Sequence, residues 1–149
     1  MKNVSFLGFD YGKKHIGVAV GSSHSRTAQP IGVLQCAKGS PDWRRVSDLV
    51  ARWQPQALIV GLPLNMDGTE NAMTRAARQF GNRLQHRYNL AVHMVDERLS
   101  SRIAKDALFE AGIPAKRHKR KLDTLAAQTI LQSFLNDYLD GGGGRQNCA

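Results

Sequence analysis

The stretch V-S-F-L-G-F-D-Y-G, residues 4–12, decides how this chain folds. An apolar run ends in a carboxylate, Asp10, and a glycine turn follows at Gly12. A short apolar run bounded by turn residues predicts a buried strand. An acid at the end of such a strand is costly to desolvate unless a cation shares its site. That cation could be a lysine, an arginine or a metal ion.

Length and composition predict one domain. The chain has 149 residues, 42% of them hydrophobic, which suffices for a single core. We expect this domain over residues 1–140 and a flexible polar tail over residues 141–149. No run reaches the ~20 apolar residues of a transmembrane helix, and no secretory signal precedes the first strand. These features predict a cytoplasmic protein without a membrane partner. Cys36 and Cys148 stand alone, which argues against zinc and against a disulfide scaffold.

The net charge predicts a polyanionic partner. Lysine and arginine number 21 against 12 acids, giving +9, a balance that points most often to nucleic acid. A merely soluble basic surface is the alternative until the charge proves to be clustered. The densest cluster is a predicted loop with five charges in six residues: Lys116, Arg117, Lys119, Arg120 and Lys121. A solvated loop would look the same in the sequence.

The order of predicted elements is βββαβαβαα. Strands over 4–10, 16–21 and 28–34 are joined by short turns and predict an antiparallel meander. Ser40 and Pro41 read as the cap and first position of a helix that Pro55 closes. A strand over 57–61, a helix starting near Thr69, a strand over 91–95, a helix from Ser100 and a last helix over 122–139 follow. The class is α/β, with a mixed five-stranded sheet: three antiparallel strands, then two parallel to the first, and helices on both faces.

Right-handed crossovers bring the carboxyl ends of the first, fourth and fifth strands to one edge, where ligands of open α/β sheets tend to bind. These ends carry Asp10, Gly61, Asp96 and Glu97, and Asp123 opens the last helix. Each acid alone has a structural explanation; Asp123, for example, would suit the positive end of its helix. Together they need a cation, because carboxylates ~4 Å apart repel by about 1 kcal/mol in water and about 4 kcal/mol at an effective dielectric of ~20. No lysine falls inside the predicted core, and oxygen ligands suit Mg²⁺ or Mn²⁺.

Four blocks of sequence resemble the YqgF family of the RNase H-like superfamily, in that family's order. They are F-D-Y-G-x-K-x-I-G-V-A-V-G (9–21), V-G-L-P-L-N-M-D-G-T-E (60–70), D-E-R-L-S-S (96–101) and L-D-x-L-A-A-x-x-I-L (122–131). Each block alone is weak evidence for the resemblance, and four blocks in the same order are strong evidence. Members are described as Holliday junction resolvases or as nucleases that mature the 5′ end of pre-16S ribosomal RNA. One departure is His15, where many members have an arginine or a small polar residue.

The resemblance implies an RNase H-like nuclease with Asp10, Glu97 and Asp123 as catalytic acids and metal ligands. Two Mg²⁺ or Mn²⁺ ions would support hydrolysis of phosphodiester bonds. The expected function is 5′-end processing of pre-16S rRNA in ribosome biogenesis, and the alternative is resolution of Holliday junctions. Partners would be precursor rRNA or branched DNA, with ribosomal particles, for a monomer or a homodimer.

Further residues complete the expected nucleic-acid groove. Lys13, Lys14 and Arg98 flank the acids and would hold phosphates together with the basic loop. Gly12 and Gly61 would let a backbone approach, although a plain turn explains each equally well. Asn65 would touch substrate, whereas residues 67–68 favour a turn.

Two other classes of function remain open. A binding module could keep the fold and lose the chemistry, but all three acids are present. A sugar- or acetate-kinase-type ATPase shares the core and the D-x-G turn. Such enzymes place hydroxyls after the glycine and use two copies of the fold, whereas this chain has Lys13 and Lys14 and one copy.

Overall fold

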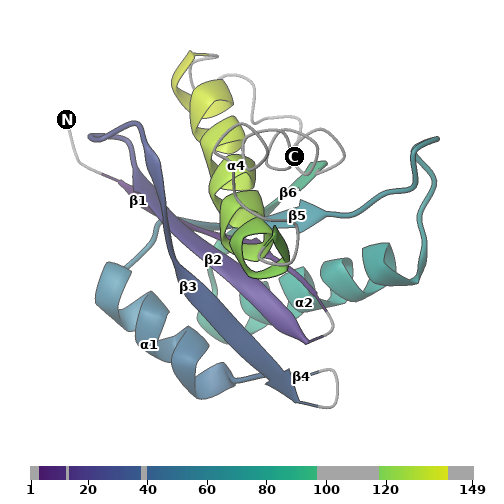
Figure 1. The fold of residues 1–149 in the computed structure, drawn as a ribbon. Coiled ribbons are helices and arrows are strands. Elements are labelled where there is room, and N and C mark those ends of the chain that lie inside the picture. The colour runs from purple at the N-terminus through teal and green to yellow at the C-terminus, as the bar shows by residue number, and fades with distance from the viewer. Residues whose placement is uncertain (1–3, 13, 38–39, 97–117, 141–149) are drawn as a thin grey trace.

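The computed structural model of the chain describes residues 4–12, 14–37, 40–96 and 118–140, with the side chains of the last segment described from 125 to 138 (Figure 1). The helix expected from Ser100 and the tail over 141–149 lie outside these ranges.

A mixed sheet forms the centre of the molecule, in the order β4-β3-β2-β1-β5-β6. β1 pairs antiparallel with β2, and β2 with β3, while β1, β5 and β6 are parallel. The predicted meander and the two parallel strands are therefore confirmed. The bounds are β1 Ser5–Asp10, β2 His15–Ser22, β3 Ala28–Ala37, β4 Ser40–Pro41, β5 Ala57–Leu62 and β6 Ala91–Asp96.

One strand, β4, was not predicted, and it shows that the predicted start of the first helix was wrong. Ser40 and Pro41 pair with Ala37 and Cys36 of β3 instead of capping the helix. Proline suits a short edge strand because it lacks an N–H, and it biases the residue before it towards extended backbone. Helix α1 (Trp43–Trp53) begins two residues later than predicted, after Asp42, whose side chain makes no capping hydrogen bond.

Helix α2 (Ala72–Tyr88) also begins later than Thr69, because a stronger cap lies downstream. The Asn71 side chain accepts a hydrogen bond from the Thr74 N–H at 3.0 Å, and the Thr74 hydroxyl accepts one from the Asn71 N–H at 3.0 Å. This reciprocal pair is a capping box, and it satisfies two N–H groups at the helix start.

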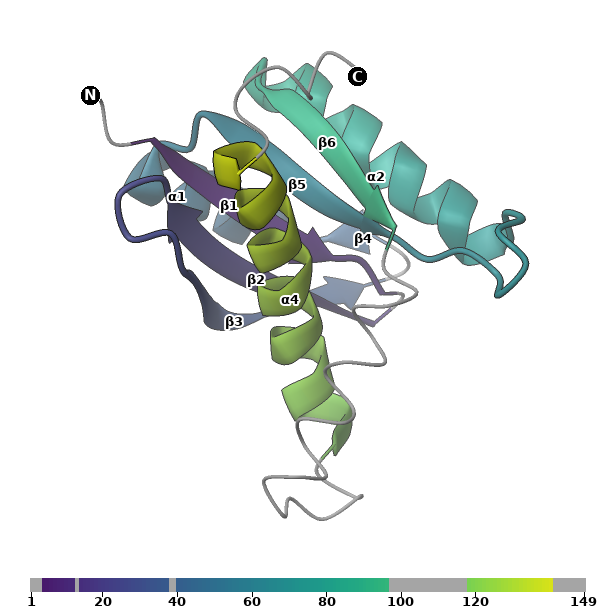
Figure 2. The same cartoon turned by 90° about the horizontal axis from the view of Figure 1, so that it is seen from above.

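The helices cover both faces of the sheet, as predicted. Helices α1 and α2 lie on one face, and α4 (His118–Asp140) crosses the other (Figures 1 and 2). Side chains of β1 alternate between the two layers. Leu7 and Phe9 enter the core under α1 and α2, whereas Phe6 packs under α4. None of the described helices is long and apolar enough to span a bilayer.

Helix α4 runs antiparallel to β1. Near its middle, the Ala127 carbonyl lies over Gly8, and a Cβ added to Gly8 would lie 3.5 Å from that oxygen. Towards its end, the rings of Phe134 and Tyr138 meet the Phe6 ring edge-on at 5.3 and 5.4 Å. The N-terminal part of α4 therefore points towards the end of β1 that carries Asp10.

Candidate functional site

The carboxyl ends of the three parallel strands meet at one edge of the sheet. Phe9 of β1 pairs with Val60 of β5, so Asp10 and Gly61 follow at the same level. Asp96 ends β6, one strand further along the edge. The structure thus brings together the strand ends that the sequence predicted to meet.

Asp10 lies on the α4 face of this edge. Phe6 packs against α4 and Gly8 lies beneath it, so the pleat places Asp10, two residues on, on the same face. Its neighbour on β2 is Gly17, and its neighbour on β5 is Gly61. Neither glycine has a side chain, so these two cross-strand neighbours place no side chain beside the half-buried Asp10 carboxylate.

Asp96 lies on the opposite face. Its pleat neighbour Met94 packs against Gly81 of α2, where a Cβ would lie 3.3 Å from the sulfur. By contrast, the His93 ring lies 5.1 Å from Phe134 of α4. Alternation along β6 therefore separates Asp96 from Asp10, although both end parallel strands of the same edge.

Asp123 belongs to α4 but not to its first turn, which corrects the predicted position. The helix begins at His118, four residues before the predicted start, and has no acid in its first turn. Residues 119–121 of the expected basic loop are therefore helical. A favourable interaction with the helix dipole is therefore a weaker explanation for Asp123, because the dipole acts mainly on charges in the first turn. The direction of α4 carries Asp123 towards the Asp10 end of the sheet.

Several predicted site residues lie outside the described ranges: Lys13, Glu97, Arg98, Lys116 and Arg117. Glu97 directly follows Asp96 in the sequence. Lys14 is described and exposed, beside the start of β2. Its carbonyl accepts a hydrogen bond from the Cys36 N–H at 2.9 Å, which ties the turn after Asp10 to β3.

The geometry of the turn after Asp10 explains why residue 12 is a glycine. A Cβ on Gly12 would lie 2.6 Å from the carbonyl oxygen of His15, closer than real Cβ atoms come. The Cys36 thiol donates to the Gly12 carbonyl at 3.7 Å, and burial raises the pKa of this thiol. A raised pKa keeps the sulfur protonated and unreactive, which fits a packing role for Cys36.

Tyr11, which follows Asp10, and Arg83, whose charge acts on Tyr11, are two residues near this edge that the sequence prediction missed. The Tyr11 ring packs 5.2 Å from Phe80 of α2. Burial raises the pKa of Tyr11, the nearby Cys36 raises it further, and the positive charge of Arg83 lowers it. Tyr11 stands within the D-Y-G block, but only the packing of α2 shows that Arg83 lies near it.

The loop over 63–71 follows β5 at this edge, and hydrogen bonds within the loop stabilise its conformation. Asn65, expected to touch substrate, donates from Nδ2 to Thr69 Oγ1 at 2.9 Å and accepts from Asn71 Nδ2 at 2.8 Å. Asp67 accepts from the N–H and hydroxyl of Thr69 at 2.9 and 2.6 Å, and Gly68 has φ +89°. The predicted turn at 67–68 is confirmed. Asn65 is exposed, with both ends of its amide bonded inside the loop.

Carboxylates are the donors that this edge offers to a cation. Within the described ranges, no three His, Cys, Asp or Glu side chains gather into one group. The carboxylate of Asp10 offers hard oxygen ligands, which suit Mg²⁺ or Mn²⁺ better than a soft metal.

Comparison with known proteins agrees with this architecture. A family model described as "RuvX: Holliday junction resolvase" matches residues 4–137. A relative from Nitrosococcus oceani, named "Putative pre-16S rRNA nuclease", is 47% identical over 88% of this chain and 86% of its own length. A relative of the same name from Klebsiella pneumoniae is 47% identical over 87% of this chain and 94% of its own length.

Solved structures with a similar fold are resolvases of low sequence identity. RuvC of Thermus thermophilus in complex with a Holliday junction substrate has a TM-score of 0.54 at 17% identity, covering 91% of this chain and 97% of that one. The fowlpox virus resolvase with Holliday junction DNA has a TM-score of 0.56 at 15% identity, covering 91% and 99%. These neighbours show the RNase H-like fold. With the family match over nearly the whole chain, this protein belongs to the RuvX family of Holliday junction resolvases.

Proposed function

We propose that this protein is an endonuclease that hydrolyses phosphodiester bonds of structured RNA, with the precursor of 16S rRNA as its substrate. The observation that carries the proposal is the position of Asp10. It ends a buried strand at the carboxyl edge of the parallel strands, on the face that α4 covers. The relatives that are 47% identical over most of the chain support the substrate.

Asp10, Glu97 and Asp123 are proposed to hold two Mg²⁺ or Mn²⁺ ions. When bound, such ions stabilise the charge that develops at phosphorus and lower the pKa of the attacking water. Asp10 would hold its ligand position through the rigidity of β1. Glu97 is preferred to Asp96 because Asp96 lies on the face opposite Asp10. Asp123 would complete the set from α4, whose direction points it to this edge.

The basic residues would hold the phosphates beside the cleaved bond. Lys14 is exposed at the turn after Asp10, and residues 119–121 lie in the first turn of α4. Lys13, Arg98, Lys116 and Arg117 are assigned the same task from the sequence. The proposal places the protein in the cytoplasm, with ribosomal particles, as a monomer or homodimer.

A second candidate is resolution of Holliday junctions, which the description of the matching family favours. The decisive experiment compares precursor 16S rRNA with a four-way DNA junction, each with Mg²⁺ and with Mn²⁺. We expect faster cleavage of the rRNA precursor and none by Asp10→Asn, which should still bind RNA. Preferred cleavage of the junction would select the second candidate. Undiminished cleavage by Asp10→Asn would refute the mechanism, and binding without cleavage of either substrate would indicate a binding module.

A further inference from the structure

The arginines of this protein are concentrated on two helices. Helices α1 and α2 carry seven of them and no lysine, although 21 residues of the chain are lysine or arginine. Asp48 is the one acid within these two helices. The arginines are Arg44, Arg45, Arg52, Arg75, Arg78, Arg83 and Arg87. All seven are exposed.

Contacts divide the arginines of α2 between its two sides. Arg78 pairs with Glu70 at 2.8 Å and lines a hollow with Val92 and Met94 of β6. Arg75, one turn earlier, lies on that side as well. Arg83 and Arg87 lie on the other side, towards α1. The Arg87 guanidinium lies 4.4 Å from the Trp43 ring centre, and the charge of Arg83 acts on Tyr11. This side of α2 therefore adjoins the Asp10 edge.

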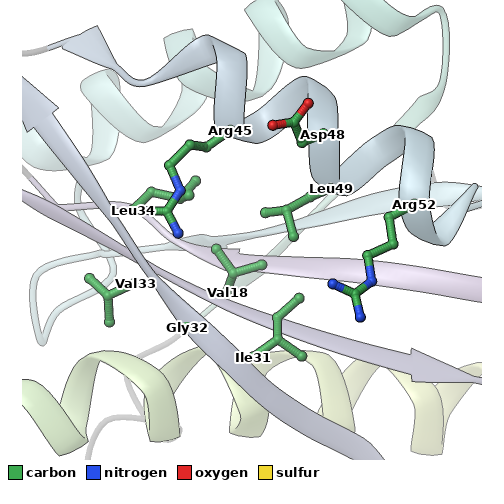
Figure 3. A pocket seen from close by; sticks show the side chains of 9 residues that line it. All are labelled: Val18, Ile31, Gly32, Val33, Leu34, Arg45, Asp48, Leu49 and Arg52. Atoms are coloured by element: carbon green, nitrogen blue, oxygen red, sulfur yellow. The ribbon is translucent and has the colours of Figure 1, made fainter.

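On α1, Arg45 and Arg52 lean over β3. They line a groove of about 200 Å³ between α1 and the sheet, whose floor is apolar and includes Val18, Ile31 and Leu49 (Figure 3). Both side chains reach towards the strands, whereas the Asp48 carboxylate points away from the groove (Figure 3). Gly32 has φ +151° at the rim, and a Cβ there would meet nothing within 4 Å, so the groove is open on the strand side.

Among the residues that the structure describes, no carboxylate forms an ion pair with Arg44, Arg45, Arg52, Arg83 or Arg87. Between residues that the structure describes, the one ion pair joins Arg78 to Glu70. On α1, three arginines stand against one acid, Asp48, so their mutual repulsion costs stability unless a partner supplies further negative charge.

The buried sides of both helices exclude a membrane as that partner. Val46 of α1 and Phe80 and Leu84 of α2 are buried against the sheet. An interfacial helix needs a free apolar face. Among the described residues, Met66 is the one large exposed hydrophobic side chain, and it lies in the 63–71 loop, off both helices. What the two helices present to solvent is exposed guanidinium groups, each of which can bind a phosphate with two hydrogen bonds.

We propose that Arg44, Arg45, Arg52, Arg83 and Arg87 form an arginine surface that holds a double-helical arm of the RNA substrate. The surface starts beside Tyr11, the residue after Asp10, and continues across α1, which is about 16 Å long, on the face of the sheet opposite to Asp10. The duplex is favoured over a single strand because single strands stack on exposed aromatic rings, and Trp43 is half-buried under Arg87. This inference rests on the proposed function, since it assumes that the cleaved substrate is RNA.

The test compares two double variants that each remove two charges. Arg45→Gln with Arg52→Gln changes the arginine surface. Arg26→Gln with Arg78→Gln is the control: Arg26 lies in the turn between β2 and β3, and Arg78 is paired with Glu70. Each pair is made in an Asp10→Asn background. Affinity for a stem-loop from precursor 16S rRNA is then measured by fluorescence anisotropy over a range of salt concentrations.

We expect the arginine-surface variant to bind the stem-loop at least tenfold more weakly. Its log–log salt slope should fall by about 1.4 to 1.8, for two lost phosphate contacts at ~0.7–0.9 each. The control should change the slope by less than half as much. Arg45→Lys with Arg52→Lys should restore the slope and only part of the affinity, because lysine cannot make the bidentate contact. Equal effects of both Gln variants would overturn the proposal.

Two further outcomes separate this inference from its alternatives. If sedimentation shows that the arginine-surface variant changes the oligomeric state, the surface is an interface between copies of the chain and the proposal fails. If Asp10→Asn still cleaves RNA, the proposed function fails, whatever the arginine variants do. If Asp10→Asn is inactive and the arginine variants bind normally, only the arginine surface is wrong.

Discussion

Gly8 of β1 lies directly beneath Leu131 of α4: a Cβ atom on Gly8 would lie 2.9 Å from the Cβ of Leu131. Real Cβ atoms do not approach so closely, so the glycine sets how near α4 can come to the sheet. Asp10 lies two residues further along the same face of β1, and α4 carries Asp123. This contact therefore also sets the spacing between the elements that carry two of the proposed metal ligands.

Gly8→Ala should destabilise the protein by about 1–3 kcal/mol, because the clash is with a Cβ atom that cannot move unless α4 moves. This cost exceeds the ~0.5–1 kcal/mol that alanine gains over glycine inside a strand. Gly21→Ala is the matched comparison. Its nearest contact, 2.7 Å from Leu135 Cδ1, is the end of a flexible side chain that can turn away. Urea unfolding should rank Gly8→Ala as the more destabilising, and the reverse order would contradict this account of α4 packing.

The two adjacent acids at the end of β6 should differ in their effect on cleavage. Asp96 lies on the α2 face, away from Asp10, so Asp96→Asn should lower kcat by less than about tenfold. Glu97→Gln removes a proposed ligand and should lower kcat by more than about 1,000-fold, a loss of at least ~4 kcal/mol in transition-state stabilisation. Single-turnover cleavage of precursor rRNA measures both. A larger loss for Asp96→Asn would assign the ligand position to Asp96.

Metal binding should be visible without any cleavage. Mn²⁺ at about 100 times its Kd should stabilise the protein by about 2.7 kcal/mol, because it binds the folded state alone. Asp10→Asn should lose this increase in melting temperature, and EDTA should reverse it in the wild type. Asp96→Asn serves as the control and should keep the shift. An equal shift in wild type and Asp10→Asn would place the metal elsewhere.

The sheet was predictable from the sequence because its strands carry their own signals. The apolar runs that end at Asp10 and Gly61, with turn residues between them, predict the strands and their order. Helix starts were less predictable. Ser40 and Pro41 have the chemistry of a cap, yet pairing with β3 outweighs it, and Asn71 outcompetes Thr69 only through its reciprocal bonds with Thr74. Such choices depend on tertiary contacts that local patterns do not contain.

The position of Asp10 at the end of a buried strand was predictable from the sequence, and its surroundings were less so. The ligand set with Glu97 and Asp123 stays a prediction. The topology alone brings the carboxyl ends of β1 and β6 to the same edge of the sheet. The separation of Asp96 from Asp10 by face needs the packing of Met94 against α2. The proposed arginine surface was not predicted for a different reason. Its arginines are spread along the sequence, whereas most of the +9 charge is accounted for by the basic run at 116–121. Asking which charges fall on the exposed side of each amphipathic helix would have found them.

The hydroxyl of Thr74 should contribute more to the stability of the protein than the volume of its side chain. It is fully buried, donates to the Pro63 carbonyl and accepts from the Asn71 N–H. Thr74→Val keeps the volume but leaves both groups without a partner, which should cost about 1–3 kcal/mol. Thr74→Ser keeps the hydroxyl and should cost less. Thermal unfolding of the two variants provides the comparison, and a more stable Val variant would show that these hydrogen bonds contribute little.

His93 should make the protein less stable in acid. Burial lowers the pKa of His93, whose ring lies 5.1 Å from Phe134 under α4. The folded state therefore resists protonation, while the unfolded chain takes up a proton near its ordinary pKa of about 6.5. Because the unfolded state then binds more protons, stability falls as the pH drops below that value and levels off below the folded pKa.

His93→Phe removes this titration and keeps an aromatic ring against Phe134. Between about pH 7.5 and pH 5.5, the melting temperature of the wild type should fall further than that of His93→Phe. The difference should appear below about pH 6.5, where histidine in the unfolded chain becomes charged. His24→Phe makes the same substitution at an exposed histidine in the turn between β2 and β3 and is the matched variant for comparison. Parallel profiles for wild type and His93→Phe would show that the ring can be protonated without leaving its place beneath α4.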